Sequence, residues 1–310
     1  MRLTGTRFAD IDYHHPEVCD DTKHWGPWIT KEVGLKGFRL DAVQHFSENF
    51  TSGWVDNLRK ECGDDMFIVG EFWVGDTVKM TEWLGKMGKK FSLFDAPLLY
   101  NFHSTSTTEK ADLRKVFDNS LVQVEPVNAV TCVQNHDTQK GQTVETPVED
   151  WFKPLAYSLI LLRSEGYPTL FYGDVYGTQG KFAEKPSCGG KLPDIALARK
   201  LYAYGEQGDY MEEPNCIGWV RRGTWDKPDG VAVAMSNAGP GQRKMLVGKE
   251  HAGETWTDIL GWEKNETKID DEGWGVFNCP AVSVAIWVNK DAQGRDQFPA
   301  KFDADIYKST

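Results

Sequence analysis

The sequence predicts an α/β fold, in which parallel strands joined by helices precede an antiparallel β-sandwich. Up to residue 204, apolar runs of strand length alternate with segments of helical periodicity, an order typical of a parallel sheet with crossover helices. From Gly205 onward, short strands broken by Gly, Asn and Pro follow one another, which indicates a separate antiparallel domain.

Five parallel strands are expected in the first part of the chain. They cover residues 37–43, 66–72, 91–97, 129–135 and 167–173. Helices are expected over residues 20–34, 47–63, 109–120, 151–164 and 194–204. Ser47 is the expected N-cap of the second helix and Gly34 the C-cap of the first, whose interior Pro27 does not fit.

The change of pattern near Gly205 predicts that the chain divides into three parts. We expect a domain of strands and helices over residues 1–204, a β-sandwich over 205–288 and a polar tail over 289–310. The expected sandwich strands include residues 217–220, 231–235, 244–247, 255–259 and 282–287.

Three acidic residues, Asp41, Glu71 and Asp137, each end a short apolar run. Burying a lone carboxylate is costly, so three repeats of this pattern predict a polar site where several buried strands end. Side chains alternate along a strand, which puts Arg39 on the same face as Asp41. In barrels of parallel strands, active sites gather at the C-terminal ends of the strands.

The composition of the chain limits the classes of partner that it can be expected to bind. The net charge of -11 argues against a nucleic-acid backbone or an anionic membrane surface and fits a neutral substrate or a cation. No stretch is long and apolar enough to span a membrane, and the start has no signal-peptide apolar core. Six scattered cysteines favour a reducing compartment. We therefore favour a cytoplasmic monomer and leave secretion open.

The segments around the three acids resemble the conserved blocks of α-amylases, glycoside hydrolase family 13. These segments are residues 37–45, 70–73 and 133–138, in the family's order and spacing. The resemblance spans roughly residues 8–288 and points to the bacterial liquefying type and its intracellular fungal relatives.

This resemblance implies a partial (β/α)8 TIM barrel that holds strands four to eight. The barrel-strand-three block of the family carries an Asn-His pair, and the only such pair here, Asn135-His136, belongs to a later block. We therefore expect an N-terminally truncated chain that lacks strands one to three and the inserted B domain, and we expect the isolated chain to be inactive. A real short protein and a truncated gene both fit.

The resemblance also implies a role for each acid. Retaining glycosidases use two carboxyl groups roughly 5 Å apart. Asp41 would be the nucleophile and Glu71 the acid/base, and Asp137 would stabilise the cationic transition state. Arg39 would keep Asp41 ionised, and His136 would bond to sugar hydroxyls.

Three more residues are implied substrate contacts. Trp73 could stack on a sugar ring or pack in the core, while Gln44 and His45 follow the nucleophile. The family often has Lys at the position of Gln44, so a charged contact there is in doubt.

Calcium is the implied metal. Asp10 and Asp12 alternate like calcium ligands, and hard carboxylate oxygens suit this ion. In the family, this segment and the backbone carbonyl of the residue matching His45 bind a structural calcium. The other ligands would come from the missing B domain, so the site is expected to be incomplete.

The predicted function is retaining endo-hydrolysis of α-1,4-glucosidic bonds in starch, glycogen or maltooligosaccharides. Two alternatives stay open. One is a glucan-binding remnant without catalysis, and the other is a transglycosylase of the same family that uses the same three acids.

Overall fold

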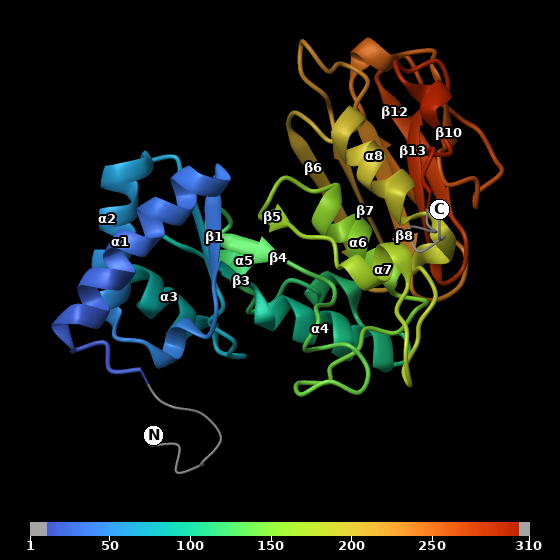
Figure 1. Cartoon of the computed structure of the whole chain (residues 1–310). Coiled ribbons are helices and arrows are strands. Elements are labelled where there is room, and N and C mark those ends of the chain that lie inside the picture. Colours follow the sequence, from blue (N-terminus) through green and yellow to red (C-terminus); the bar gives the residue numbers. More distant parts are fainter. Residues whose placement is uncertain (1–10, 304–310) are drawn as a thin grey trace. The chain divides into compact units, whose positions relative to one another are not determined.

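The structure is a computed structural model that describes residues 11–303. Figure 1 shows its elements along the chain. The chain divides into two compact units, Met1–Phe94 and Asp95–Thr310, which are described separately. Within the described residues, no helix is long and apolar enough to cross a membrane.

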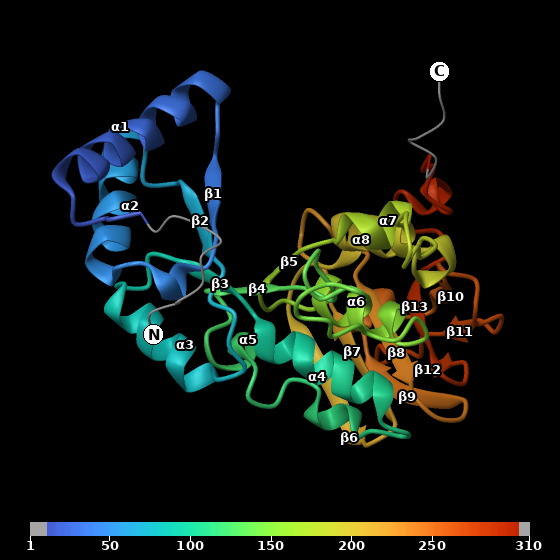
Figure 2. The ribbon, with the colours of Figure 1, turned by 60° about the horizontal axis from the view of Figure 1, so that its bottom comes forward.

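The first unit is a layer of parallel strands with helices on one face (Figure 2). Its strands pair in chain order, one helix precedes the first strand, and the other two helices connect the strands. The strands are β1 (Gly37–Leu40), β2 (Phe67–Gly70) and β3 (Ser92–Phe94), and the helices are α1 (Pro16–Val33), α2 (Glu48–Cys62) and α3 (Thr77–Lys86).

Apolar packing between strand and helices fixes the orientation of β1. The ring of Phe38 meets the Trp54 ring of α2 edge-on at 5.3 Å and lies 6.3 Å from the Trp25 ring of α1. Because side chains alternate along a strand, Arg39 projects from the face of β1 opposite to these helices.

The predicted helix ends of this unit are confirmed. Ser47 Oγ accepts a hydrogen bond from Phe50 N at the start of α2, and Gly34 closes α1 in the left-handed conformation with φ 75°. Pro27 lies buried in the interior of α1, which begins at Pro16, four residues before the predicted start.

The second unit begins with the rest of the helix–strand pattern. Strands β4 (Ala129–Thr131) and β5 (Tyr167–Pro168) pair in parallel. The helices are α4 (Ala96–Thr107), α5 (Leu121–Val124), α6 (Lys153–Leu161), α7 (Tyr172–Tyr176) and α8 (Leu192–Tyr202).

The helix predicted over residues 109–120 is wrong. The helix instead lies before these residues: it is α4, which starts shortly after β3, so the strand predicted over residues 91–97 is also too long. Asp95 stops the strand because its carboxylate caps α4 by accepting from Leu98 N, and Pro97 is favoured in a first helical turn. Residues 109–120 contain only the 3-10 turn Leu113–Lys115.

The prediction of a buried strand over residues 167–173 is also wrong. The strand in this segment covers only β5, and the side chains of Tyr167 and Leu170 are exposed. Pro168 has no N–H to donate to a sheet, and α7 begins at Tyr172. The strand predicted over residues 129–135 likewise ends at Thr131.

The C-terminal part of the second unit is an antiparallel β-sandwich. A six-stranded sheet has the order β11-β10-β13-β8-β7-β6, and β12 pairs with β9 in a second sheet. The strands are β6 (Gln207–Glu213), β7 (Cys216–Arg221), β8 (Val231–Ser236), β9 (Gly241–Leu246), β10 (Thr255–Asp258), β11 (Thr267–Lys268), β12 (Trp274–Cys279) and β13 (Ser283–Asn289). Between the sheets, the Phe277 ring lies 5.8 Å from those of both Trp256 and Trp287.

Candidate active site

Arg39 joins two of the three predicted acids in the first unit. Its guanidinium lies 2.5 Å from Asp41 Oδ1 through Nη1 and 3.0 Å from Glu71 Oε2 through Nη2. The planar guanidinium carries several N–H donors in a fixed fork, so one side chain can hold two carboxylates in a defined arrangement. The ends of β1 and β2 therefore bring Asp41 and Glu71 to a common cation.

The backbone after Asp41 strengthens this arrangement. Ala42 is in the left-handed conformation, with φ 44° and ψ 44°, and its N–H donates to Glu71 Oε2 at 3.1 Å. The next N–H, of Val43, donates to the Glu71 carbonyl oxygen at 3.0 Å. A left-handed non-glycine residue costs about 1 kcal/mol or more, and such strain gathers at functional sites.

Gly70 lets the chain turn closely at this point. A Cβ at this position would lie 3.1 Å from both Leu93 Cδ2 and Val43 Cγ2, tighter than ordinary contact. Val43 is buried and opens a 3-10 turn, Val43–His45. The residue before Glu71 and the second residue after Asp41 therefore pack against each other.

The two carboxylates differ in their access to solvent. The Asp41 side chain is 73% exposed, whereas the Glu71 side chain is 14% exposed. Asp41 is thus open to a reacting molecule, while Glu71 is shielded and held by the Arg39 guanidinium and the Ala42 amide.

The third predicted acid, Asp137, lies in the second unit and is paired with its neighbour. His136 Nε2 is 3.2 Å from Asp137 Oδ2. Asn135 shapes this turn, because its Oδ1 accepts from Asp137 N and Thr138 N, each at 2.9 Å. Both site side chains keep access to solvent, at 63% for His136 and 37% for Asp137.

The predicted substrate contacts beyond these residues all lie in the first unit. His45 is exposed, and Trp73 is half-buried. The Oε1 atom of half-buried Gln44 is shielded from solvent and accepts no hydrogen bond among the described residues.

The predicted carboxylate ligands of calcium lie at the start of the described part of the chain or before it. Asp10 lies outside the described residues, and Asp12 Oδ1 accepts from the backbone N–H of His14 at 2.9 Å. No three His, Cys, Asp or Glu side chains cluster for a metal ion within residues 11–303.

Asp95 shows that an acid at a strand end can also be structural. It follows β3, is fully buried, and accepts from the backbone N–H groups of Leu98, Leu121 and Val122. Burial raises the pKa of its carboxyl, and the three donors oppose that rise. The following Ala-Pro pair, which favours a helix start, is the sequence signal that separates Asp95 from the catalytic candidates.

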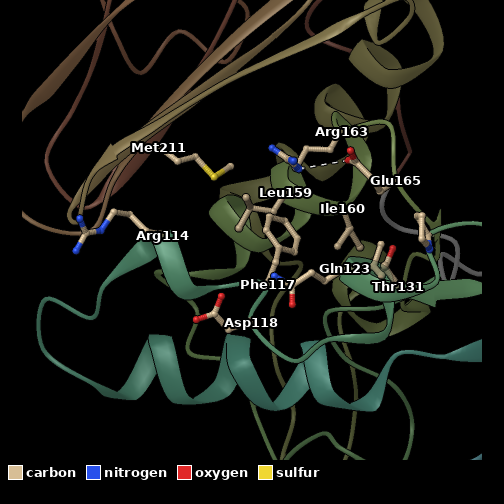
Figure 3. A pocket seen from close by; sticks show the side chains of 12 residues that line it. Arg114, Phe117, Asp118, Gln123, Thr131, Leu159, Ile160, Arg163, Glu165 and Met211 are labelled. Carbon is tan, nitrogen blue, oxygen red and sulfur yellow. Dashed lines mark ion pairs between the residues drawn. The ribbon is translucent and has the colours of Figure 1, made fainter. Parts of the chain in front are cut away.

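A separate cavity of about 430 Å³ lies in the second unit (Figure 3). Arg163 and Glu165 line it and form an ion pair at 3.6 Å, and Arg163 also binds Asp209 at 2.7 Å. None of the predicted site residues lines this cavity.

Comparisons with known proteins agree with the fold. Residues 1–192 match the family described as the α-amylase catalytic domain, and residues 231–288 match the α-amylase C-terminal family. The α-amylase of Bacillus licheniformis is 44% identical over 286 residues, which cover 91% of this chain and 56% of that protein. The cytoplasmic α-amylase of Escherichia coli is 37% identical over 293 residues, 90% of this chain and 58% of that protein.

Solved structures share the fold. An α-amylase from Anoxybacillus superimposes with a TM-score of 0.68 at 16% identity, covering 91% of this chain and 65% of that one. An α-amylase from Malbranchea cinnamomea gives a TM-score of 0.65 at 15% identity, covering 91% of this chain and 62% of that one. The predicted fold class, part of a TIM barrel with a C-terminal β-sandwich, is confirmed.

The architecture and the matches place the chain in a class of proteins built like glycoside hydrolases. More narrowly, the chain belongs to the α-amylase family, glycoside hydrolase family 13, as its sequence blocks indicate. It spans about half the length of the curated relatives it matches, at 56% and 55% of the first two.

Proposed function

We propose that this chain carries the catalytic acids of a retaining α-1,4-glucan hydrolase. The observation that carries the proposal is the double ion pair of Arg39 with Asp41 and Glu71. Retaining hydrolysis needs two neighbouring carboxyl groups with different roles, and a shared guanidinium keeps this pair close. The relatives named α-amylase and maltohexaosidase support α-1,4-glucans as the substrate class.

In this proposal, Asp41 is the nucleophile. Its carboxylate attacks the anomeric carbon and forms a glycosyl-enzyme while the glycosidic C–O bond breaks. Its 73% exposure leaves an oxygen open to the sugar, and the Arg39 guanidinium orients the group.

Glu71 is the proposed general acid and base. It protonates the leaving glycosidic oxygen and then takes a proton from the water that hydrolyses the glycosyl-enzyme. The Ala42 N–H fixes one of its oxygens, which leaves the other to make the transfer.

We propose that Asp137 stabilises the transition state and that His136 bonds to sugar hydroxyls. A carboxylate near the anomeric centre stabilises the positive charge of the transition state. The 3.2 Å contact between His136 Nε2 and Asp137 Oδ2 supports the assignment, because it presents a donor and an acceptor side by side for sugar hydroxyls. Trp73, Gln44 and His45 are proposed contacts on the first unit.

Calcium binding and the domain boundaries are further proposals. Asp10, Asp12 and the His45 carbonyl would supply part of a calcium site, and a calcium-dependent rise in Tm would support it.

We also propose that the chain consists of a barrel domain over residues 1–204, a sandwich over 205–288 and a tail over 289–310. Limited proteolysis that cuts near residue 205 would support this division.

Turnover of α-glucans by the purified chain tests the proposed function, and the absence of turnover would instead support the expectation that the isolated chain is inactive. Release of reducing ends from maltoheptaose should fall at least about 10³-fold in Glu71→Gln, which keeps the shape of the side chain but cannot transfer the proton. Glu266→Gln, at an exposed position of the β-sandwich directly before β11, is the control and should keep turnover. Binding without turnover by the unaltered chain would support the glucan-binding remnant instead. Products longer than the substrate would support a transglycosylase.

A further inference from the structure

Two cysteine thiols face each other across the β-sandwich. Cys216 opens β7 in the six-stranded sheet, and Cys279 ends β12 in the two-stranded sheet. Their sulfur atoms are 3.9 Å apart, although the residues are 63 positions apart in sequence. Cys216 is half-buried and Cys279 is 1% exposed, so one thiol of the pair can be reached from solvent.

The surroundings leave room for this pair. Gly241 of β9 lies opposite Cys279 in the strand register, and a Cβ there would come within 2.5 Å of Cys216 Sγ and 3.4 Å of Cys279 Sγ. Arg243, two residues further along β9, donates to the carbonyl oxygen of Cys216 through Nε at 2.7 Å. The glycine thus provides the space for the two sulfurs, and the arginine places a positive charge beside them.

These surroundings distinguish the Cys216–Cys279 pair from the single buried cysteines, Cys132 and Cys188. Burial raises the pKa of both Cys132 and Cys188 to about 12, so these thiols stay protonated. The thiol of Cys279 donates a hydrogen bond that, together with the Arg243 charge, lowers the pKa of Cys216 to about 7 despite partial burial. The same contact raises the pKa of Cys279. The contact therefore favours the thiolate on Cys216, and the thiolate is the form that attacks disulfides.

We propose that Cys216 and Cys279 are an oxidation site that closes to a disulfide between the two sheets when the protein meets a low-molecular-weight disulfide. The Cys216 thiolate attacks one sulfur of the small disulfide, which forms a mixed disulfide and releases one small thiolate. Cys279 then loses its proton, and its sulfur displaces the second small thiol from Cys216. Two protein thiols are oxidised and one disulfide is reduced to two thiols.

The required movement is small. An S–S bond is about 2.05 Å long, so the sulfurs, now 3.9 Å apart, must approach each other by roughly 2 Å. The site is independent of the proposed hydrolase function, because none of the proposed catalytic residues takes part.

Thiol labelling of the whole chain tests the proposal. The protein is equilibrated in buffers of graded oxidised-to-reduced glutathione ratio. It is then acid-quenched, denatured and alkylated, and the masses of its peptides are determined by mass spectrometry. We expect Cys216 and Cys279 to lose alkylation together and to appear as one linked peptide pair that lacks two hydrogen atoms. Cys132 and Cys188 should stay alkylated.

Two variants assign the order of the steps. Cys279→Ala should stop the reaction at glutathione bound to Cys216, whereas Cys216→Ser should leave Cys279 alkylated. Cys62→Ser, which alters a thiol outside the pair, should form the linked pair as the unaltered protein does. Alkylation of both cysteines at every ratio, or glutathione on Cys216 of the unaltered chain without a link to Cys279, would overturn the proposal.

Discussion

The backbone N–H of Ala42 donates a hydrogen bond to Glu71 Oε2 at 3.1 Å, so the residue that follows Asp41 holds the side chain of the second acid. Ala42 adopts a left-handed conformation to do this, with φ 44°. The turn that ends β1 therefore builds the site as well as ending the strand.

This geometry predicts opposite effects for two substitutions of Ala42. Ala42→Gly should keep the N–H donor and raise the free energy of unfolding by up to about 1 kcal/mol, because glycine adopts the left-handed region without penalty. Ala42→Val should lower both stability and turnover, since a β-branched side chain resists this conformation. Urea unfolding and maltoheptaose turnover measure the two effects. Equal stability of the two variants would contradict the conformational role.

Arg39 should matter far more for turnover than for stability. Arg39→Ala removes both ion pairs and should reduce kcat by about 10²-fold or more, whereas partly exposed pairs add little to unfolding free energy. Arg39→Lys should recover only part of kcat, because an ammonium is a point charge without the planar fork. Full activity in Arg39→Lys would show that the double contact is not needed. Arg114→Ala, which removes an exposed pair with Asp112 in the second unit, serves as the control.

A buried ion pair should dominate the stability of the second unit. Lys153 Nζ lies 2.8 Å from Asp174 Oδ1, both side chains are 2% exposed, and the Tyr157 hydroxyl donates to the other oxygen at 2.5 Å. Lys153→Met would leave a buried carboxylate without its cation and should cost about 3–5 kcal/mol in denaturant unfolding. Lys249→Met removes a cation from an exposed pair with Glu272 and should cost under about 1 kcal/mol. Similar losses in both variants would contradict the role of burial.

Asp95 should make stability depend on pH in a definite direction. Burial raises the pKa of Asp95 in the folded protein above its ordinary value of 3.8. The folded state then holds this proton more tightly than the unfolded state, so the contribution is present below pH 3.8 and is lost as pH rises through the folded pKa. The unfolding free energy of the unaltered protein minus that of Asp95→Asn should therefore fall over this interval. A difference that rises with pH would mean that the backbone donors outweigh burial.

The local elements of the first unit could be predicted because each carries its own signals. Ser47 before an apolar periodic segment indicated the start of α2, and Gly34 indicated the end of α1. The region after Phe94 was mispredicted because Asp95 reads as one more acid at the end of an apolar strand. Its caps to Leu121 and Val122, 26 and 27 residues away, are tertiary contacts that no local pattern reveals.

The acids of the candidate site could be proposed from the sequence for a related reason. Asp41 and Glu71 end short strands within matched sequence blocks, so their order and spacing are sequence properties. The left-handed turn at Ala42 and the second contact of Arg39, to Glu71, depend on how β1 and β2 align. Alternation along a strand predicted that Arg39 shares a face with Asp41, but it says nothing about a residue on the neighbouring strand.

The most direct test of the account is to trap the glycosyl-enzyme. An activated fluorosugar with the α-glucosyl configuration, which forms this intermediate faster than water removes it, is incubated with the chain, and its peptides are sequenced by mass spectrometry. We predict a single added sugar on Asp41, and none in Asp41→Asn. A sugar on Glu71 or Asp137, or no covalent sugar under conditions that label a full-length α-amylase, would contradict the assignment of Asp41 as nucleophile.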